Sequence, residues 1–186
     1  WLPFDPPDVP NRTLGGLVAT GLSGPLWAGY GQLRNHVLGA TIVCGDGRAL
    51  RLGGKVVKNV AGFDILKVMV GSRGELAVIT SVTVRLFPLP VVDQLLVLEA
   101  ADVSELVSTA RAVATAPIMP ASIILSATSD GGRLLVRLHG ARVSVEADQK
   151  SLEKHTGVSF EVRNTPEAEP LLAQERGSGI NTKFAV

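Results

Sequence analysis

One stretch of this chain holds six glycines within residues 13–31, and it restricts the possible fold more than any other feature. Glycine has no Cβ, so a backbone built from it can turn sharply and approach a ligand closely, with its N–H groups facing an anion. The stretch lacks the Gly-Lys-Ser/Thr of a Walker loop and the Gly-x-Gly-x-x-Gly of a Rossmann unit. Two interpretations stay open: glycine turns between short strands, or a backbone wall for an anionic ligand.

The segments after the glycine-rich stretch follow one another in a specific order. They are residues 34–39 (Arg-Asn-His-Val-Leu-Gly), 40–44, the Gly-Asp-Gly turn at 45–47, the Gly-Gly pair at 53–54, 58–64 (Lys-Asn-Val-Ala-Gly-Phe-Asp), 70–80 (Val-Gly-Ser-Arg-Gly-Glu-Leu-Ala-Val-Ile-Thr) and 87–90 (Phe-Pro-Leu-Pro). Taken together they resemble the second half of the FAD-binding domain of the vanillyl-alcohol oxidase/PCMH flavoprotein family. Within this family, residues 2–90 are most similar to glycolate oxidase subunits of the GlcE type.

The resemblance implies that FAD is the cofactor and that two segments wrap it, largely through backbone groups. By position, the candidate cofactor-binding residues are Thr13, Gly15, Gly16, Ala19, Ser23, Gly24, Gly31, Gly74, Leu76, Val78 and Ile79. The small residues of this set fit a wall that lies against a flat ring and a diphosphate. For Leu76, Val78 and Ile79, a plain buried strand is an alternative that can hold at the same time.

The sequence departs from the family pattern at three points. Residues 73–77 read Arg-Gly-Glu-Leu-Ala where Glu-Gly-Thr-Leu-Gly is familiar, which places a charge where a small hydroxyl residue is common. Asn35 follows Arg34 where aspartate is usual. The first half of the FAD domain, with its own phosphate-binding loop, does not precede Trp1, so we expect the chain to be part of a longer protein.

Composition excludes several classes of function. The 186 residues are 46% hydrophobic and 19% charged, with a net charge of +1 and no basic run, which does not indicate a nucleic-acid partner. No apolar stretch approaches the ~20 residues of a membrane-spanning helix. The single cysteine, Cys44, excludes an internal disulfide, and we expect a buried structural thiol. The three histidines have no metal-ligand spacing, so we interpret them as surface or satisfied histidines and expect no metal site.

Hydrophobic patterns predict an α+β fold with two domains and a polar tail, at residues 1–92, 93–165 and 166–186. In the first domain, strands are expected at 37–43, 49–52 and 76–86, and a short helix at 65–70. As the partial PCMH-type domain of the resemblance, this part should form a mixed sheet with short helices.

The second domain has a regular order of predicted elements. Its strands are expected at 94–99, 122–128, 133–139 and 158–162, with helices at 102–116 and 141–155. The order β-α-β-β-α-β is that of a ferredoxin-like unit. Such a unit can bind RNA, but Leu134, Val136 and Leu138 offer no aromatic pair on which bases could stack. In the family that the chain resembles, a cap of related type covers the flavin.

The resemblance implies an FAD-dependent oxidoreductase subunit that oxidises a small 2-hydroxy acid, such as glycolate, to its 2-oxo acid, glyoxylate. Its expected partners are a sister flavoprotein subunit and an iron–sulfur subunit, which would hold it in the cytoplasm at the inner face of the membrane. The sister subunit carries the catalytic histidine motif, so no catalytic residue is assigned in this chain. The alternative is a non-catalytic assembly subunit that keeps the fold without functional FAD, which Arg73 and Glu75 favour.

Overall fold

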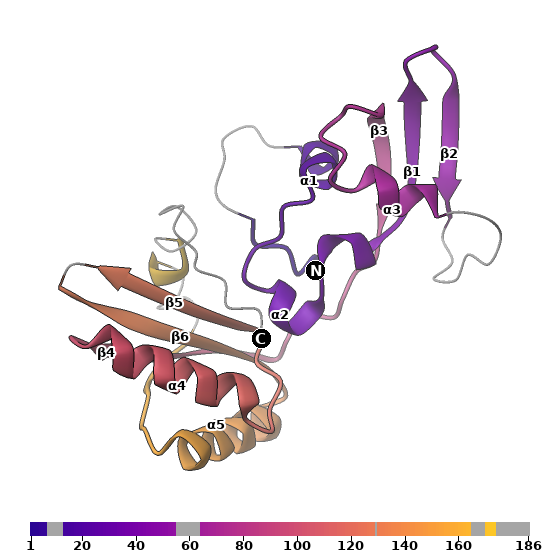
Figure 1. The fold of residues 1–186 in the computed structure, drawn as a ribbon. Coiled ribbons are helices and arrows are strands. Elements are labelled where there is room, and N and C mark those ends of the chain that lie inside the picture. Colours follow the sequence, from indigo (N-terminus) through magenta and orange to yellow (C-terminus); the bar gives the residue numbers. More distant parts are fainter. Residues whose placement is uncertain (7–12, 55–63, 129, 165–169, 174–186) are drawn as a thin grey trace. The chain divides into compact units, whose positions relative to one another are not determined.

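The computed structural model describes residues 1–6, 13–54, 64–128, 130–164 and 170–173. They form two compact units, one of Trp1–Gly24 with Gly31–Pro88 and one of Pro25–Tyr30 with Leu89–Val186 (Figure 1). The chain therefore leaves the first unit within the glycine-rich stretch and returns to it six residues later. The domain limits that we expect at residues 92 and 165 remain a proposal.

The first unit is built on a three-stranded sheet of order β2-β1-β3. Its elements are α1 (Leu14–Thr20), η1 (Leu33–Asn35, a 3₁₀ turn), β1 (Val37–Cys44), β2 (Ala49–Gly53), α3 (Ile65–Met69) and β3 (Ala77–Val84). Both strand pairs are antiparallel. The described part of this sheet is therefore not the mixed sheet that we expected. A short turn joins β1 to β2, and so tight a connection can join only antiparallel strands.

The core of the first unit lies between this sheet and the helices α1 and α3. Alternation along β1 turns Ala40 and Ile42 toward the helices, and the half-buried Cys44 packs against the same cluster. The buried residues of the cluster are Leu17, Val18, Leu33, Val37, Ala40, Ile42, Leu66, Met69 and Ala77. Helix α3 begins at Asp64, whose side chain accepts a hydrogen bond from the amide of Lys67.

The second unit confirms the predicted β-α-β-β-α-β order. Its elements are α2 (Trp27–Tyr30), β4 (Val92–Ala100), α4 (Val103–Thr115), β5 (Ser122–Thr128), β6 (Gly131–Gly140), α5 (Arg142–Thr156) and β7 (Glu161–Asn164). The strands form an antiparallel sheet of order β5-β6-β4-β7. The last strand begins three residues later than predicted, because Gly157 ends α5 with a φ of 71° and the chain needs residues 158–160 to reach the sheet.

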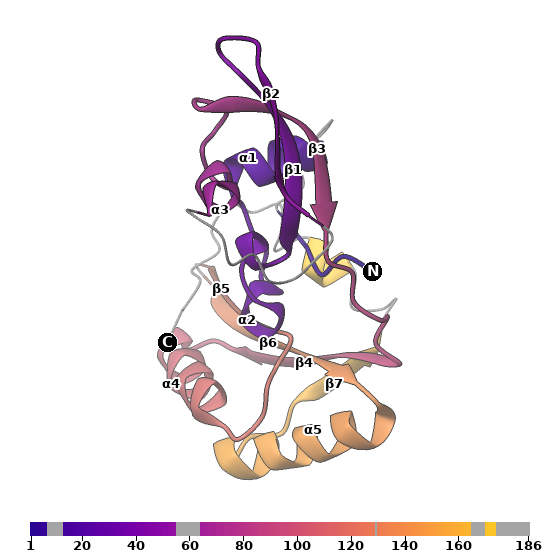
Figure 2. The same ribbon diagram turned by 90° about the vertical axis from the view of Figure 1, so that its right-hand side faces the viewer.

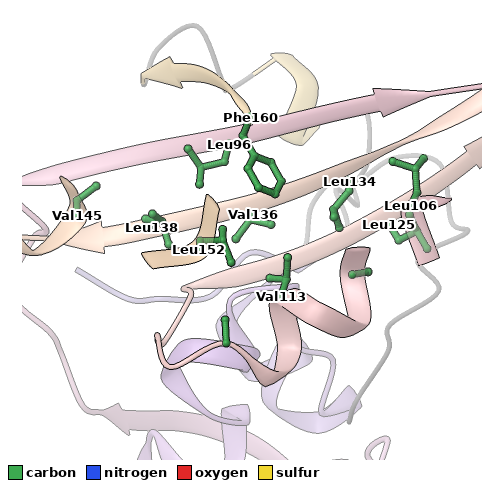
Figure 3. Close-up of a cluster of buried hydrophobic side chains, with 12 residues drawn as sticks. Leu96, Leu106, Val113, Leu125, Leu134, Val136, Leu138, Val145, Leu152 and Phe160 are labelled. Atoms are coloured by element: carbon green, nitrogen blue, oxygen red, sulfur yellow. The ribbon is translucent and has the colours of Figure 1, made fainter. Parts of the chain in front are cut away.

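Helices α4 and α5 cover one face of this sheet, and α2 lies on the other side (Figure 2). Figure 3 shows the buried side chains between the helices and the sheet, among them Leu106 of α4, Leu134 of β6 and Leu152 of α5. On the opposite face, Leu172 from a helical turn at 170–173 packs against residues of β4, β5 and β6. No helix in the described ranges has the length and apolar content that crossing a membrane requires.

We expect Leu152→Ala to lower the free energy of unfolding by about 2–5 kcal/mol, because it leaves a cavity between α5 and the sheet. Val143 on the same helix is largely exposed, so Val143→Ala should change it by less than about 0.5 kcal/mol. Urea unfolding followed by circular dichroism compares the two variants. Equal losses would contradict the packing of α5 described above.

Candidate functional site

The glycine-rich stretch contains a helix where glycine turns were one expectation. Thr13 is the N-cap of α1, and its hydroxyl oxygen accepts a hydrogen bond from the Gly16 amide at 3.0 Å. Gly21 ends the helix with a φ of 66° and donates to the carbonyls of Leu17 and Val18. Threonine before a helix and glycine after it are ordinary start and stop signals. Here the two glycines in the first turn concealed them.

Helix α1 and the turn before β3 are joined by backbone hydrogen bonds. The amide of Gly71 donates to the Val18 carbonyl at 3.0 Å, and the amide of Arg73 donates to the Ala19 carbonyl at 2.7 Å. At the other end of the helix, a Cβ on Gly15 would lie 3.4 Å from the carbonyl oxygen of Ile79. The structure therefore brings together two groups of predicted site residues that lie more than fifty positions apart: Thr13, Gly15, Gly16 and Ala19 with Gly74, Leu76, Val78 and Ile79.

Contacts within the protein give a structural reason for three of the predicted cofactor-binding residues. A Cβ on Gly24 would lie 1.7 Å from the carbonyl oxygen of Asp5, so this position accepts only glycine. The hydroxyl oxygen of Ser23 accepts a hydrogen bond from the amide of Leu33 at 3.2 Å. Gly31 has a φ of 86°, which disfavours other residues. Contact of Ser23, Gly24 and Gly31 with FAD stays a prediction, because each has a structural reason of its own.

Packing among the described residues does not explain Gly15 and Gly16. Within the described ranges, a Cβ on Gly15 would make ordinary contacts with Ile79, and a Cβ on Gly16 would meet the hydroxyl oxygen of Thr13 at 3.2 Å and no other atom within 4 Å. Each glycine costs a helix about 1 kcal/mol relative to alanine. Two glycines in a seven-residue helix therefore destabilise that helix, and the contacts among described residues do not offset this loss. A ligand that approaches the bare backbone at this turn would explain both.

Two apolar side chains next to this helix are exposed. Leu76 is 55% exposed and Val78 is 64% exposed, whereas Ile79 is half-buried and packs against the core of the first unit. Successive residues of a strand point to opposite faces, so Val78 lies on the outer face of β3, whereas Leu76 lies in the bend just before the strand. The plain buried strand that we kept as an alternative therefore holds for Ile79 alone. Exposed apolar surface of this kind suits a flat ring system.

The turn into β3 carries an unusual residue for its backbone angle. Arg73 has a φ of 55° and is the one non-glycine residue in the described ranges with a positive value. The left-handed conformation costs a side-chain-bearing residue about 1–2 kcal/mol, which the hydrogen bond from Arg73 to Ala19 helps to offset. Gly74 follows with a φ of 82° and is exposed. The turn thus presents a cationic side chain beside the predicted site.

His36 follows the glycine-rich stretch by five residues and is buried in the first unit. Its ring is 5.2 Å from the ring of Phe4 and 5.4 Å from that of Phe87, measured between centroids. Its Nε2 donates to the Gly31 carbonyl at 3.2 Å, since a carbonyl can only accept. Its buried Nδ1 has no hydrogen-bond partner in the described part of the chain. The histidine thus fixes the backbone of Gly31.

The second unit holds a polar cluster that sequence reasoning missed. The hydroxyl of Tyr30 lies 2.8 Å from His139 Nδ1, His139 Nε2 lies 3.0 Å from Asp93, and Arg137 binds both oxygens of the same carboxylate. Burial would raise the pKa of Asp93, but hydrogen bonds from Arg137 and His139 and the charge of Arg137 outweigh it and hold that pKa well below its usual range. His139 is therefore a satisfied histidine, as predicted.

Residues with the character of metal ligands do not gather in this structure. In the ranges that it describes, no three side chains of histidine, cysteine, aspartate or glutamate form a group that could hold a metal ion. His155 lies exposed near the end of α5.

The residues present fit two features of FAD in the first unit. Gly15 and Gly16 leave the backbone of the first turn of α1 bare, which suits a diphosphate, and the exposed side chains of Leu76 and Val78 offer apolar surface to a ring. The exposed Thr13 lies beside them as the N-cap of α1.

Comparison with known proteins adds a family and several relatives. Residues 1–53 match the family model of the FAD binding domain. Glycolate oxidase subunit GlcE of Escherichia coli (strain K12) is 47% identical over 90 residues, which are 48% of this chain and 26% of that protein. D-lactate dehydrogenase of Archaeoglobus fulgidus is 47% identical over 88 residues, which are 47% of this chain and 20% of that protein.

Two further matches extend over nearly the whole chain. Glycolate oxidase subunit GlcD of Bacillus subtilis (strain 168) is 29% identical over 201 residues, which cover 97% of this chain and 43% of that protein. The solved structure of alkyldihydroxyacetonephosphate synthase superimposes with a TM-score of 0.75 at 16% identity, over 94% of this chain and 38% of the other, which shows a shared fold. The chain spans less than half the length of each of these proteins.

Substitution by alanine should change the free energy of unfolding in opposite directions at Gly24 and at Gly16. Gly24→Ala should lower the free energy of unfolding by about 3 kcal/mol or more, because its methyl group would overlap Asp5. Gly16→Ala should leave it unchanged or raise it by up to ~1 kcal/mol, because alanine favours the helix. Urea unfolding of both variants measures this difference. A large loss in Gly16→Ala would show that packing, not a ligand, requires this glycine.

Proposed function

Because this chain is a relative of the PCMH-type FAD-binding flavoproteins, as its sequence predicted, we propose that it forms part of the flavin site of a 2-hydroxy-acid oxidoreductase. FAD is the cofactor that this family binds. The relatives named above are oxidases and dehydrogenases of glycolate and D-lactate, and both compounds are small 2-hydroxy acids. The observation that carries the proposal is the pair Gly15 and Gly16, because contacts among the described residues do not require glycine at either position.

The chain's own residues would bind FAD by leaving space and by supplying apolar contact. Gly15 and Gly16 would let the diphosphate approach the backbone of the first turn of α1. Leu76 and Val78 would pack against a ring and exclude water from it. When bound, FAD supplies the hydride acceptor for oxidation of the substrate, and the protein supplies position and electrostatics. Thr13, Ala19, Gly74 and Ile79 would support these contacts from the same two segments.

The substrate, partners and location follow from the same relationship. We propose glycolate or a close 2-hydroxy acid as the substrate. A sister flavoprotein subunit and an iron–sulfur subunit would receive the electrons, and would hold the protein at the inner face of the membrane on the cytoplasmic side. We assign no catalytic residue to this chain, because the complex that it resembles carries its catalytic histidine motif on a sister subunit.

A second function has one observation in its favour. Arg73 presents a cationic side chain beside Gly74, where the family pattern has glutamate, and Glu75 places a charge where the family commonly has a small hydroxyl residue. A cation held at position 73 would suit contact with an acidic partner as well as contact with a diphosphate. The alternative is therefore a non-catalytic assembly subunit that keeps the flavoprotein fold without functional FAD.

The visible absorption spectrum of the protein, purified without added flavin and then titrated with FAD, separates the two functions. About one equivalent of bound flavin supports the redox function. Loss of the flavin absorbance on anaerobic addition of glycolate or D-lactate, with the partner subunits present, identifies the substrate class. A protein that stays colourless and takes up no FAD contradicts the flavin proposal and favours the assembly role.

We expect Gly16→Ala to raise the dissociation constant of FAD at least about ten-fold, or ~1.4 kcal/mol, and Gly16→Val to abolish flavin retention. The added side chain would occupy the path of the diphosphate to the backbone. Gly45→Ala is the matched control, because a Cβ there would meet no atom within 4 Å and the position lies in the turn after β1. A full complement of FAD in Gly16→Val would contradict the proposed site.

A further inference from the structure

Arg73 of the first unit occupies a backbone conformation that its own side chain makes unfavourable. Its φ of 55° is the one positive value of a non-glycine residue in the described ranges. Its neighbours Gly71 and Gly74 have φ values of 87° and 82°, and both are glycines. Glycine would relieve the strain at position 73 as well, because it has no Cβ. Strained residues of this kind cluster where the side chain has a function.

Backbone contacts with α1 fix the turn that carries Arg73. The Arg73 amide donates to the Ala19 carbonyl at 2.7 Å, and the Gly71 amide donates to the Val18 carbonyl at 3.0 Å. A Cβ on Gly21 would lie 3.1 Å from the Cα of Gly71, so the end of the helix and the turn approach each other closely. These contacts use backbone groups and would form with any residue at position 73. They therefore give no reason for an arginine there.

The side chain of Arg73 is exposed and forms no ion pair with another described residue. Other cations of the first unit do pair, as Lys67 does with Asp64 at 3.2 Å. Glu75 lies two positions further along the same turn and is exposed too, but the two side chains do not form an ion pair in the described structure. The guanidinium of Arg73 therefore remains available to an anion that is not among the described residues.

Apolar surface follows this cation along the chain. Leu76 and Val78 come three and five positions after Arg73, and both are largely exposed. They are the side chains that would pack against the flavin ring. A guanidinium presents its N–H donors in a planar fork that matches the paired oxygens of a phosphate or a carboxylate. A fixed arginine followed by exposed apolar side chains suits a ligand that has both a ring and an oxyanion.

We propose that Arg73 is a binding residue of the flavin site and contacts an oxyanion of the bound ligand. The inference rests on the proposed flavin function, and it adds a residue at which this chain departs from the family pattern, which has glutamate there. Two groups offer the required chemistry: the diphosphate of FAD and the carboxylate of the 2-hydroxy acid. Separate measurements distinguish these two sources.

The test compares Arg73→Gly, Arg73→Lys and Arg51→Gln in the full chain. Arg73→Gly removes the cation and relieves the left-handed strain, so its midpoint of urea unfolding should stay equal or rise. Unfolding would then not explain weaker ligand binding. Arg73→Lys keeps the charge but loses the planar fork. Arg51 of β2 is exposed and forms no ion pair with a described residue, so Arg51→Gln is the matched control for loss of one positive charge.

If Arg73 contacts the diphosphate, Arg73→Gly should raise the dissociation constant of FAD about ten-fold, with Arg73→Lys between it and the wild type. The dissociation constant should also depend less steeply on salt concentration in Arg73→Gly, because ions screen an exposed charge contact. Inorganic diphosphate, added without FAD, should raise the Tm of the wild type and of Arg51→Gln more than that of Arg73→Gly.

If Arg73 contacts the substrate carboxylate, FAD should bind equally well to the wild type and to Arg73→Gly. Oxalate is a suitable probe, because it has carboxylates but no hydrogen that the flavin could accept. Its binding to the FAD-loaded protein is measured by the change in the flavin absorption spectrum. The dissociation constant of oxalate should rise about ten-fold in Arg73→Gly and stay unchanged in Arg51→Gln.

Weaker binding of FAD or of oxalate in Arg73→Gly, absent in Arg51→Gln, supports the inference. Unchanged binding of both overturns it, and so does an equal effect in Arg51→Gln. A lower urea midpoint in Arg73→Gly overturns it as well, because the arginine side chain would then serve the packing of the protein. A wild-type protein that takes up no FAD contradicts the proposed function. In that case the Tm shift with inorganic diphosphate still decides whether Arg73 binds an oxyanion, so the two failures are distinguishable.

Discussion

Two backbone hydrogen bonds hold the candidate flavin site together. The amides of Gly71 and Arg73 donate to carbonyls of Val18 and Ala19 at the last turn of α1, where a helix has carbonyls without internal partners. These bonds use no side chain, so they join two distant segments whatever residue stands in the turn. They help to offset the cost of the left-handed conformation of Arg73, and they accompany the packing of α1 against β3.

Residues 25–30 of the same glycine-rich stretch are held by a different kind of interaction. In the second unit, Tyr30 and Gly29 dock on the sheet, one face of which also carries an apolar cluster of Leu95, Val97 and Leu135. A buried ion pair such as Asp93 and Arg137 contributes little net stability, because desolvation of the charges offsets their attraction. Its use is geometric, since it fixes the orientation of His139 and thereby of Tyr30. Stability of the unit comes instead from the apolar clusters on both faces of the sheet.

The glycines of this one stretch have different physical roles. Gly24 and Gly29 permit close contact with other parts of the chain, and Gly21 and Gly31 supply left-handed backbone angles. Among the described residues Gly15 and Gly16 do neither, which is why we propose them for the flavin site. Composition alone treats all six glycines alike. The atoms that a Cβ would meet at each position separate a glycine required by packing from one that leaves the backbone open.

The sequence by itself determined the α+β class, the resemblance to FAD-binding flavoproteins, and the order of elements in the second unit. These follow from local patterns and from an ordered series of motifs, which need no tertiary contact. Tertiary structure alone decided that residues 14–20 are helical, that Leu76 and Val78 are exposed, and that Tyr30, His139, Asp93 and Arg137 meet. These outcomes depend on pairings between distant residues, such as Asp93 opposite His139, and no local pattern encodes which strands become neighbours.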